Sequence, residues 1–240
     1  MFIGTILNAL GIFIGALLGL TLTRRMTQPT QLAWRSLMGV FTVFVGLRLS
    51  WLSFNGGFYQ ILKQVMIMLL SMSLGKIIGG RLHIQDGLNR LGRNAGERFS
   101  RARPEDPNRL NEGFMVCSML FCAGPLGWLG SVTEGLTGHW EPLAIKMVMD
   151  GLAAVGFVSV FGWGVLLSAI PVLAFQSSLT VLVVRLEPFL RVHGLVDSIN
   201  VIVGFLLFSV ALIILEIRKV RLGDYLPSLI VAPLITWYWR

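Results

Sequence analysis

Apolar segments long enough to cross a bilayer fill most of this 240-residue chain. An α-helix needs about 20 predominantly apolar residues to span the hydrocarbon core of a membrane. Lipid offers the backbone no hydrogen-bonding partner, so these segments must be helices whose N–H and C=O groups pair internally. We therefore expect an all-α, polytopic transmembrane helical bundle of about seven or eight spans, forming a single integral-membrane domain over residues 1–240. The expected spans lie near residues 2–22, 36–54, 58–79, 113–132, 143–161, 165–184, 195–216 and 224–238.

Charged residues are few and unevenly placed. Only 13% of the residues are charged, against about 25% in a typical soluble domain, so little of the chain remains for a separate soluble domain. The net charge of +8 would suggest nucleic acid in a soluble protein, but here most of it gathers in three segments typical of cytoplasmic loops. We expect anionic lipid headgroups as partners and no nucleic acid. These basic residues are Arg24, Arg25, Arg35, Lys76, Arg81, Arg90, Arg93, Arg98, Arg101, Arg103, Arg109, Arg218, Lys219 and Arg221.

The same charges set the expected topology. The first apolar segment has no basic residue before it and is followed by Arg24 and Arg25, the reverse of a secretory signal. We therefore expect a retained first helix, with both chain termini outside. Eight spans leave Arg185 and Arg191 outside. A re-entrant fourth segment is the alternative, and it would place the basic residues of 218–221 outside instead.

The longest polar stretch, residues 81–112, is expected to be a basic cytoplasmic connector within the membrane domain. Residues 82–91 are amphipathic enough to form an interfacial helix. The remainder has the Pro, Asn and charged residues of a flexible loop.

Helix-breaking residues interrupt the fourth apolar segment. Pro125 removes a backbone donor and clashes with the preceding turn, while Gly124 and Gly127 lower the energy of non-helical backbone. A helix opened here exposes carbonyl groups on one side and amides on the other, with opposite partial charges, and Cys122 stands beside the opening. We interpret the segment as a candidate ion- or solute-binding element. The alternative is a proline kink that only shapes packing.

Two ionisable residues follow in the next expected span. Lys146 and Asp150 are four positions apart, so their side chains can pair on a helix. An ionisable residue inside a membrane indicates a functional site by default, because charge at that depth is unfavourable. Asp150 could take up a proton or cation, while Lys146 keeps it ionised or meets an anion. In the alternative, Lys146 extends to the membrane interface and Asp150 is a structural partner.

Uncharged polar residues and a glycine stripe complete the set of candidates. Asn8 in the first span and Gln176 in the sixth can line a shared cavity, or else only hydrogen-bond between helices. Gly11, Gly15 and Gly19 recur every four residues and allow another helix to approach closely. Because a chain this short is expected to work as a homodimer, the stripe is a candidate dimer interface.

The sequence carries no signature of an enzyme. It has no HExxH pair, GxSxG elbow, P-loop or Rossmann fingerprint, so we expect no catalytic residue, no cofactor and no metal site. His83, His139 and His193 stand far apart in expected loops. Cys117 and Cys122 are five positions apart, about 500° around a helix, which disfavours a disulfide between them.

Matching residues along nearly the whole chain identify a family. They are Gly4, Thr5, Asn8, Leu74, Gly75, residues 120–125, 129–131 and 134–138, Lys146, Asp150, Gly151, residues 162–165, Gln176 and residues 226–229. The pattern resembles the YdfK-like family of bacterial inner-membrane proteins, catalogued as domain of unknown function 554. The resemblance implies the family's membrane fold and location, and no established activity. Glu134 stands where the family often has Asp, Ser177 where Gly is common, and Val203 where a Gly-Gly pair is usual.

The leading hypothesis is a small secondary transporter or channel-like protein for a small solute or ion. Broken helices and internal repeats around a midplane site are typical of transporters, and residues 8–15 resemble residues 150–157. One rival is a non-transporting scaffold, or a sensor that signals through residues 81–112. Another is a membrane-embedded enzyme acting on lipid. The candidate binding residues are Asn8, Cys122, Gly124, Pro125, Gly127, Lys146, Asp150 and Gln176.

Overall fold

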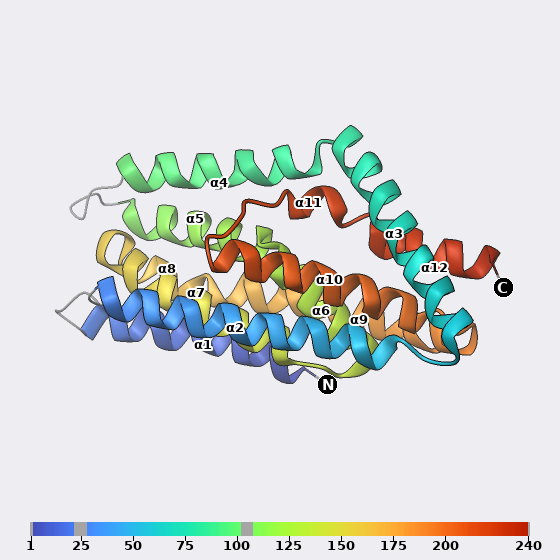
Figure 1. Ribbon diagram of the computed structural model, residues 1–240. Helices are drawn as coiled ribbons and strands as arrows, with labels where there is room; N and C mark the ends of the chain where they lie inside the picture. Colours follow the sequence, from blue (N-terminus) through green and yellow to red (C-terminus); the bar gives the residue numbers. More distant parts are fainter. Residues whose placement is uncertain (1, 22–27, 102–107, 240) are drawn as a thin grey trace. The chain divides into compact units, whose positions relative to one another are not determined.

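A computed structural model describes residues 2–21, 28–101 and 108–239 (Figure 1). Over this part of the chain the regular elements are all helices, as the apolar pattern predicts. Arg24, Arg25 and Arg103 lie outside the described residues. The helices are α1 (Ile3–Thr21), α2 (Gln28–Ser53), α3 (Phe58–Arg81), α4 (Ile84–Arg101), α5 (Arg109–Ala123), α6 (Pro125–Thr137), α7 (Glu141–Phe161), α8 (Gly164–Leu167), α9 (Ala169–Val192), α10 (Val196–Ile214), α11 (Leu222–Tyr225) and α12 (Ser228–Tyr238).

Six segments of the described chain are long and apolar enough to cross a membrane. A seventh is added if Leu110–Ala123 and Pro125–Thr137, which meet at a bend of 58°, are counted as one broken span. The expectation of a polytopic helical bundle with one broken helix is confirmed. The six are Ile3–Thr21, Leu32–Ser53, Phe58–Arg81, Glu141–Phe161, Gly164–Val192 and Val196–Ile214.

Two segments differ from the expected spans. Residues 224–238 were expected to cross the membrane, but Pro227 separates α11 from α12. The 11 residues of α12 rise about 16 Å, roughly half of the 30 Å hydrocarbon core, so α12 is too short to span. Conversely, α9 continues through the expected loop at Arg185 and Arg191 to Val192.

The chain divides into two compact units that alternate along the sequence. Unit 1 comprises Met1–Gln31 and Leu88–Leu182. Unit 2 comprises Leu32–Gly87 and Val183–Arg240. All the candidate binding residues belong to unit 1.

In unit 1, α1 packs along α7 through its glycine stripe. A Cβ built on Gly15 would overlap the carbonyl oxygen of Gly151, and one built on Gly19 would come within 2.7 Å of the carbonyl oxygen of Val155. Gly11 meets Met147 in the same way. The stripe is therefore filled by a helix of the same chain, which corrects its interpretation as a dimer interface.

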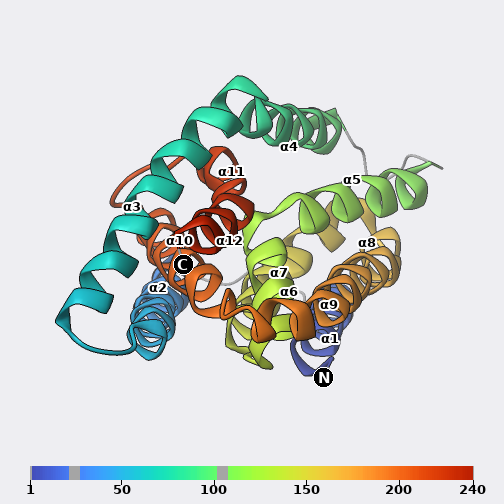
Figure 2. The same ribbon diagram turned by 90° about the vertical axis from the view of Figure 1, so that its right-hand side faces the viewer.

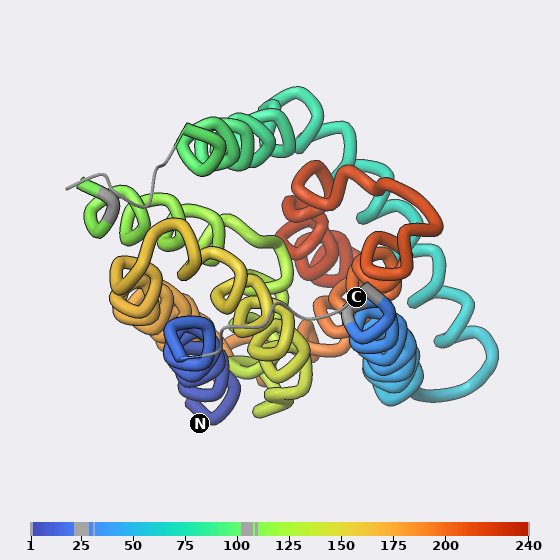
Figure 3. The backbone as a smooth tube through the Cα atoms, turned by 90° about the vertical axis from the view of Figure 1, so that its left-hand side faces the viewer, coloured from blue at the N-terminus to red at the C-terminus, as the bar shows by residue number. Residues whose placement is uncertain are grey.

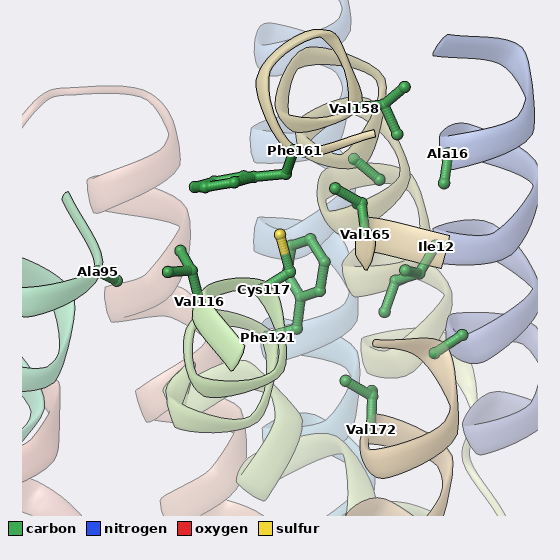
Figure 4. Close-up of a cluster of buried hydrophobic side chains, with 12 residues drawn as sticks. Ile12, Ala16, Ala95, Val116, Cys117, Phe121, Val158, Phe161, Val165 and Val172 are labelled. Carbon is green, nitrogen blue, oxygen red and sulfur yellow. The ribbon is translucent and has the colours of Figure 1, made fainter. Parts of the chain in front are cut away.

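The apolar core of unit 1 lies between α1, α5, α7 and the segment that follows α7 (Figure 4). Ile12 from α1, Cys117 and Phe121 from α5, and Phe161 from α7 all point into it. The thiol of Cys117 is free and buried, as expected of a small apolar side chain.

Helix α4 is longer than the interfacial helix expected at residues 82–91. It runs from Ile84 to Arg101, so the expected flexible loop is helical in its first half. Ala95 is buried in the unit 1 core, and the ring of Phe99 packs edge-on against Phe161, with centroids 5.6 Å apart. Leu88, Leu91, Ala95 and Phe99 recur at three- and four-residue intervals, a helical period that extends the amphipathic face.

In unit 2, α3 packs against α11 and α12 (Figure 3, teal and red). A Cβ on Gly75 would come within 2.7 Å of the backbone nitrogen of Ser228. Asp224, buried in α11, accepts hydrogen bonds from the backbone N–H of Gln85 (3.2 Å) and from Nε of Arg221 (2.7 Å). Because Gln85 is in the first turn of α4, Asp224 fixes the start of that helix.

Replacing Gly15 by Ala tests the α1–α7 contact. The new methyl group would overlap the carbonyl oxygen of Gly151, and overpacking of this kind lowers stability by about 1–3 kcal/mol. Gly156→Ala is the matched control, since nothing lies within 4 Å of its Cβ position. There, Ala should raise stability by about 0.5–1 kcal/mol through its better helix propensity. Unfolding midpoints in detergent should move in opposite directions, and equal shifts would contradict the packing.

Candidate functional site

The candidate site begins at the break, where the chain bends from α5 into α6 (Figure 2). The break lies in unit 1. Gly124, at the junction, has an extended backbone with φ −62° and ψ 127°, the conformation that a following proline favours. Pro125 then takes the first position of α6, where its missing N–H leaves no hydrogen bond unmade. The local sequence Gly-Pro therefore ends one helix and starts the next.

Lys146 and Asp150 of α7 form an ion pair next to this break. Lys146 is only 4% exposed, and its ammonium group donates a hydrogen bond to Oδ2 of Asp150. Its Nζ lies 3.6 Å from the Cβ position of Gly124. The side chain turns toward the break and not to the surface, so the snorkelling alternative is wrong in this structure.

Gly127, in the first turn of α6, also lies close to Lys146. A Cβ built there would lie 3.0 Å from Cε of Lys146 and 3.2 Å from Nε2 of Gln176. Both contacts are tighter than most real Cβ contacts. The absence of a side chain at Gly127 therefore lets the lysine stem and the Gln176 amide reach the start of α6.

Asn8 of α1 and Gln176 of α9 add two fully buried amides. Nδ2 of Asn8 donates to Oε1 of Gln176 at 3.2 Å, and the Asn8 side chain lies beside Asp150. Two buried atoms of this pair have no protein partner: Oδ1 of Asn8, an acceptor, and Nε2 of Gln176, a donor. Leaving a buried polar atom unpaired is unfavourable by about 1–3 kcal/mol, so the pair is incomplete as a purely structural contact.

The structure brings the predicted candidates together. Cys122 is half-buried at the end of α5, and its thiol lies within electrostatic range of both Lys146 and Asp150. The cluster, here called the break site, combines residues of α1 and α9 with residues of the consecutive helices α5, α6 and α7. No group of three potential metal ligands occurs among the residues described. The break site consists of Asn8, Cys122, Gly124, Pro125, Gly127, Lys146, Asp150 and Gln176.

Glu134 is a buried charged residue that the sequence did not mark as buried. The spans expected at residues 113–132 and 143–161 leave the residues between them as a loop, but α6 continues to Thr137. The carboxylate of Glu134 accepts hydrogen bonds from the backbone N–H groups of Gly4 (2.6 Å) and Thr5 (3.2 Å) and from the Thr5 hydroxyl (2.7 Å). It thereby caps the N-terminus of α1, where unpaired amides and the helix dipole favour an anion.

The sequence carried a signal for the helix around Glu134, although not for its contact with α1. Leu126, Leu129 and Thr133 share a helical period with Glu134, and Phe2, directly before Ile3, has no side-chain oxygen that could cap the first helix. An uncapped helix start in an apolar setting needs an acceptor from elsewhere in the chain.

Removing one partner of the Lys146–Asp150 pair should destabilise the protein strongly. Lys146→Met leaves Asp150 as an unpaired buried charge, a loss of about 3–5 kcal/mol. The double variant Lys146→Met/Asp150→Leu should recover most of that loss, because an apolar pair of similar volume replaces the ion pair. Unfolding in detergent measures the cycle.

The exposed pair Glu187–Arg191, also four residues apart on one helix, is the matched control. Arg191→Met should change the free energy of unfolding by less than about 1 kcal/mol. Equal losses at both pairs would contradict the burial of Lys146.

Glu134→Ala should also lower stability. The substitution leaves the N–H groups of Gly4 and Thr5 without their acceptor, and loss of a helix cap removes about 0.5–2 kcal/mol. Hydrogen exchange should speed up at the first turn of α1 before it does so elsewhere in that helix. Glu134→Gln keeps one acceptor oxygen and should retain part of the protection. Unchanged exchange in Glu134→Ala would show that the cap is not needed.

Comparisons with known proteins agree with the membrane fold. The uncharacterized membrane protein YdfK of Bacillus subtilis (strain 168) is 26% identical over 232 residues, covering 97% of this chain and 94% of YdfK. The uncharacterized protein YqgA of Escherichia coli (strain K12) is 26% identical over 241 residues, covering 100% of this chain and 98% of YqgA. No solved structure gives a significant match. The family model described as "Protein of unknown function (DUF554)" matches residues 3–237, and the chain belongs to this family.

Proposed function

We propose that this membrane protein is a small secondary transporter or channel-like protein, and that the break site binds the small solute or ion that it carries. The observation that carries the proposal is the buried Lys146–Asp150 pair beside two buried amide atoms that lack protein partners. A site that only held helices together would complete its own hydrogen bonds. A charged site with unpaired hydrogen-bonding atoms instead suits a solute or ion that binds reversibly.

The position of the pair supports the proposal. Asp150 lies beside the midpoint of α7, the span Glu141–Phe161. Charged groups at such depth are unfavourable, and in membrane proteins they mark solute and ion pathways. A buried ion pair is in itself weak evidence for stability, because apolar residues of similar volume often do as well or better. A functional role gives a reason for keeping it.

The broken helix supports the same function. α5 and α6 have 15 and 13 residues, so each is about 20 Å long and neither spans the hydrocarbon core alone. The carbonyl end of α5 and the amide end of α6 meet at Gly124, and such half-helix ends bind solutes and coupling ions in transporters. We further propose a location in the bacterial inner membrane, with residues 81–112 cytoplasmic and assembly as a homo-oligomer.

Solvent access to the break site separates a transporter from a dry scaffold. In a background of Cys117→Ala and Cys122→Ser, a single Gly124→Cys substitution places a thiol where the nearest side-chain atom is 3.6 Å from the Cβ position. Membrane-impermeant thiol reagents applied from each side should label it, because a transport pathway admits water.

Two control positions calibrate that experiment. Ala154→Cys lies in the apolar core of unit 1, and Gly156→Cys lies on the exposed face of the same helix, where lipid would cover it. Neither should react. Protection of Gly124→Cys equal to that of both controls would favour the scaffold or sensor over the transporter.

A further inference from the structure

We infer that the break site binds a small carboxylate anion between the first turn of α6, the ammonium group of Lys146 and the side-chain amide of Gln176. The inference rests on the proposed function and narrows it to a class of solute. Acetate is the simplest member of that class.

Hydrogen-bond donors gather at one side of the break. The helix dipole places partial positive charge at the first turn of α6. Pro125 has no N–H there, and the N–H of Gly127 donates to the carbonyl of Gly124 at 3.0 Å, so side chains must supply most of the donors. Nζ of Lys146 lies 3.6 Å from the Cβ position of Gly124, and Nε2 of Gln176 lies 3.2 Å from that of Gly127. A charged donor and a neutral donor therefore both approach the first turn of α6.

The Gln176 amide is the independent sign of an occupant. Its Oε1 accepts from Asn8, which directs Nε2 toward Gly127, and Nε2 is buried without a protein partner. Gln176 is fully buried, so bulk water does not satisfy this donor. A carboxylate can accept from Nε2 with one oxygen and from Lys146 with the other.

The charges of the site favour an anion over a cation. The carboxylate of Asp150 is already paired with the ammonium group of Lys146, so a cation would have to displace the lysine or bind beside its positive charge. An entering anion instead competes with Asp150 for the lysine. Three groups surround Asp150: Lys146 is its ion-pair partner on α7, Asn8 is a neighbouring neutral amide on α1, and Cys122 is a neighbouring thiol on α5.

Because acetate and Asp150 compete for Lys146, removing the charge of Asp150 should raise the affinity for acetate. Asp150→Asn leaves the buried Lys146 without its anion, so acetate should bind about tenfold more tightly than to the unaltered protein. Lys146→Met should abolish acetate binding. Gly127→Ala, whose methyl group would meet both Lys146 and Gln176, should weaken it about tenfold, while Gly156→Ala should leave it unchanged.

The experiment is a titration of the purified, full-length protein in detergent. The thermal unfolding midpoint is followed against sodium acetate at constant ionic strength, and binding appears as a rising midpoint. Acetamide, the neutral counterpart of similar shape, should have no effect. Asp150→Asn is expected to lose stability without acetate and to regain it as acetate is added, which also shows that the variant folds.

A cation site predicts the reverse order and would overturn the inference: Asp150→Asn would then bind acetate no more tightly, and sodium would stabilise only the unaltered protein. An equal response to acetamide would overturn it as well. Different results would contradict the proposed transport function and the carboxylate inference. If Gly124→Cys is sealed from water while acetate binds in the predicted order, the carboxylate site stands and transport does not. If Gly124→Cys is labelled but acetate does not bind, only the carboxylate inference falls.

Discussion

The close approach of α1 to α7 is the contact on which unit 1 depends. It requires glycine on both helices, because the backbone of Gly15 rests against the carbonyl group of Gly151. With the helices this near, Asn8 on α1 reaches Asp150, the residue directly before Gly151, and Gln176 on α9. Glu134 then holds the beginning of α1 through the amides of Gly4 and Thr5. The glycine contact therefore sets the register of the polar groups as well as the packing.

The break between α5 and α6 places two helix ends opposite those polar groups. A continuous helix at this point would present side chains and satisfied backbone groups to α7. The Gly-Pro junction instead presents helix ends, whose amides and carbonyls carry partial charges. Gly127 lets the stem of Lys146 and the amide of Gln176 approach. One buried ion pair, two incomplete amides and a helix end thus meet in a small volume, which is the basis of both functional proposals.

Much of the architecture could be predicted because membrane spans obey a strong physical constraint. The length of the apolar segments, the break at Gly124 and Pro125, and the pairing of Lys146 with Asp150 all follow from local sequence. The predictions were wrong where one local sequence pattern was compatible with two different structures. The stripe of Gly11, Gly15 and Gly19 showed that a helix would approach closely, but not that the partner would be α7 of the same chain. At Glu134, polar composition suggested a loop, although a buried carboxylate can also cap a distant helix.

The sequence by itself determined that the chain is a helical membrane protein, that its fourth apolar segment breaks at Gly124 and Pro125, and which residue types could form a polar site. Hydrophobic length and backbone chemistry act locally, so these features can be derived residue by residue. Only the tertiary structure decided that Asn8, Lys146, Asp150 and Gln176 meet at Gly124 and Gly127, and that Glu134 caps α1. Those contacts join residues up to 168 positions apart, and they are set by how closely whole helices pack, which no local pattern specifies.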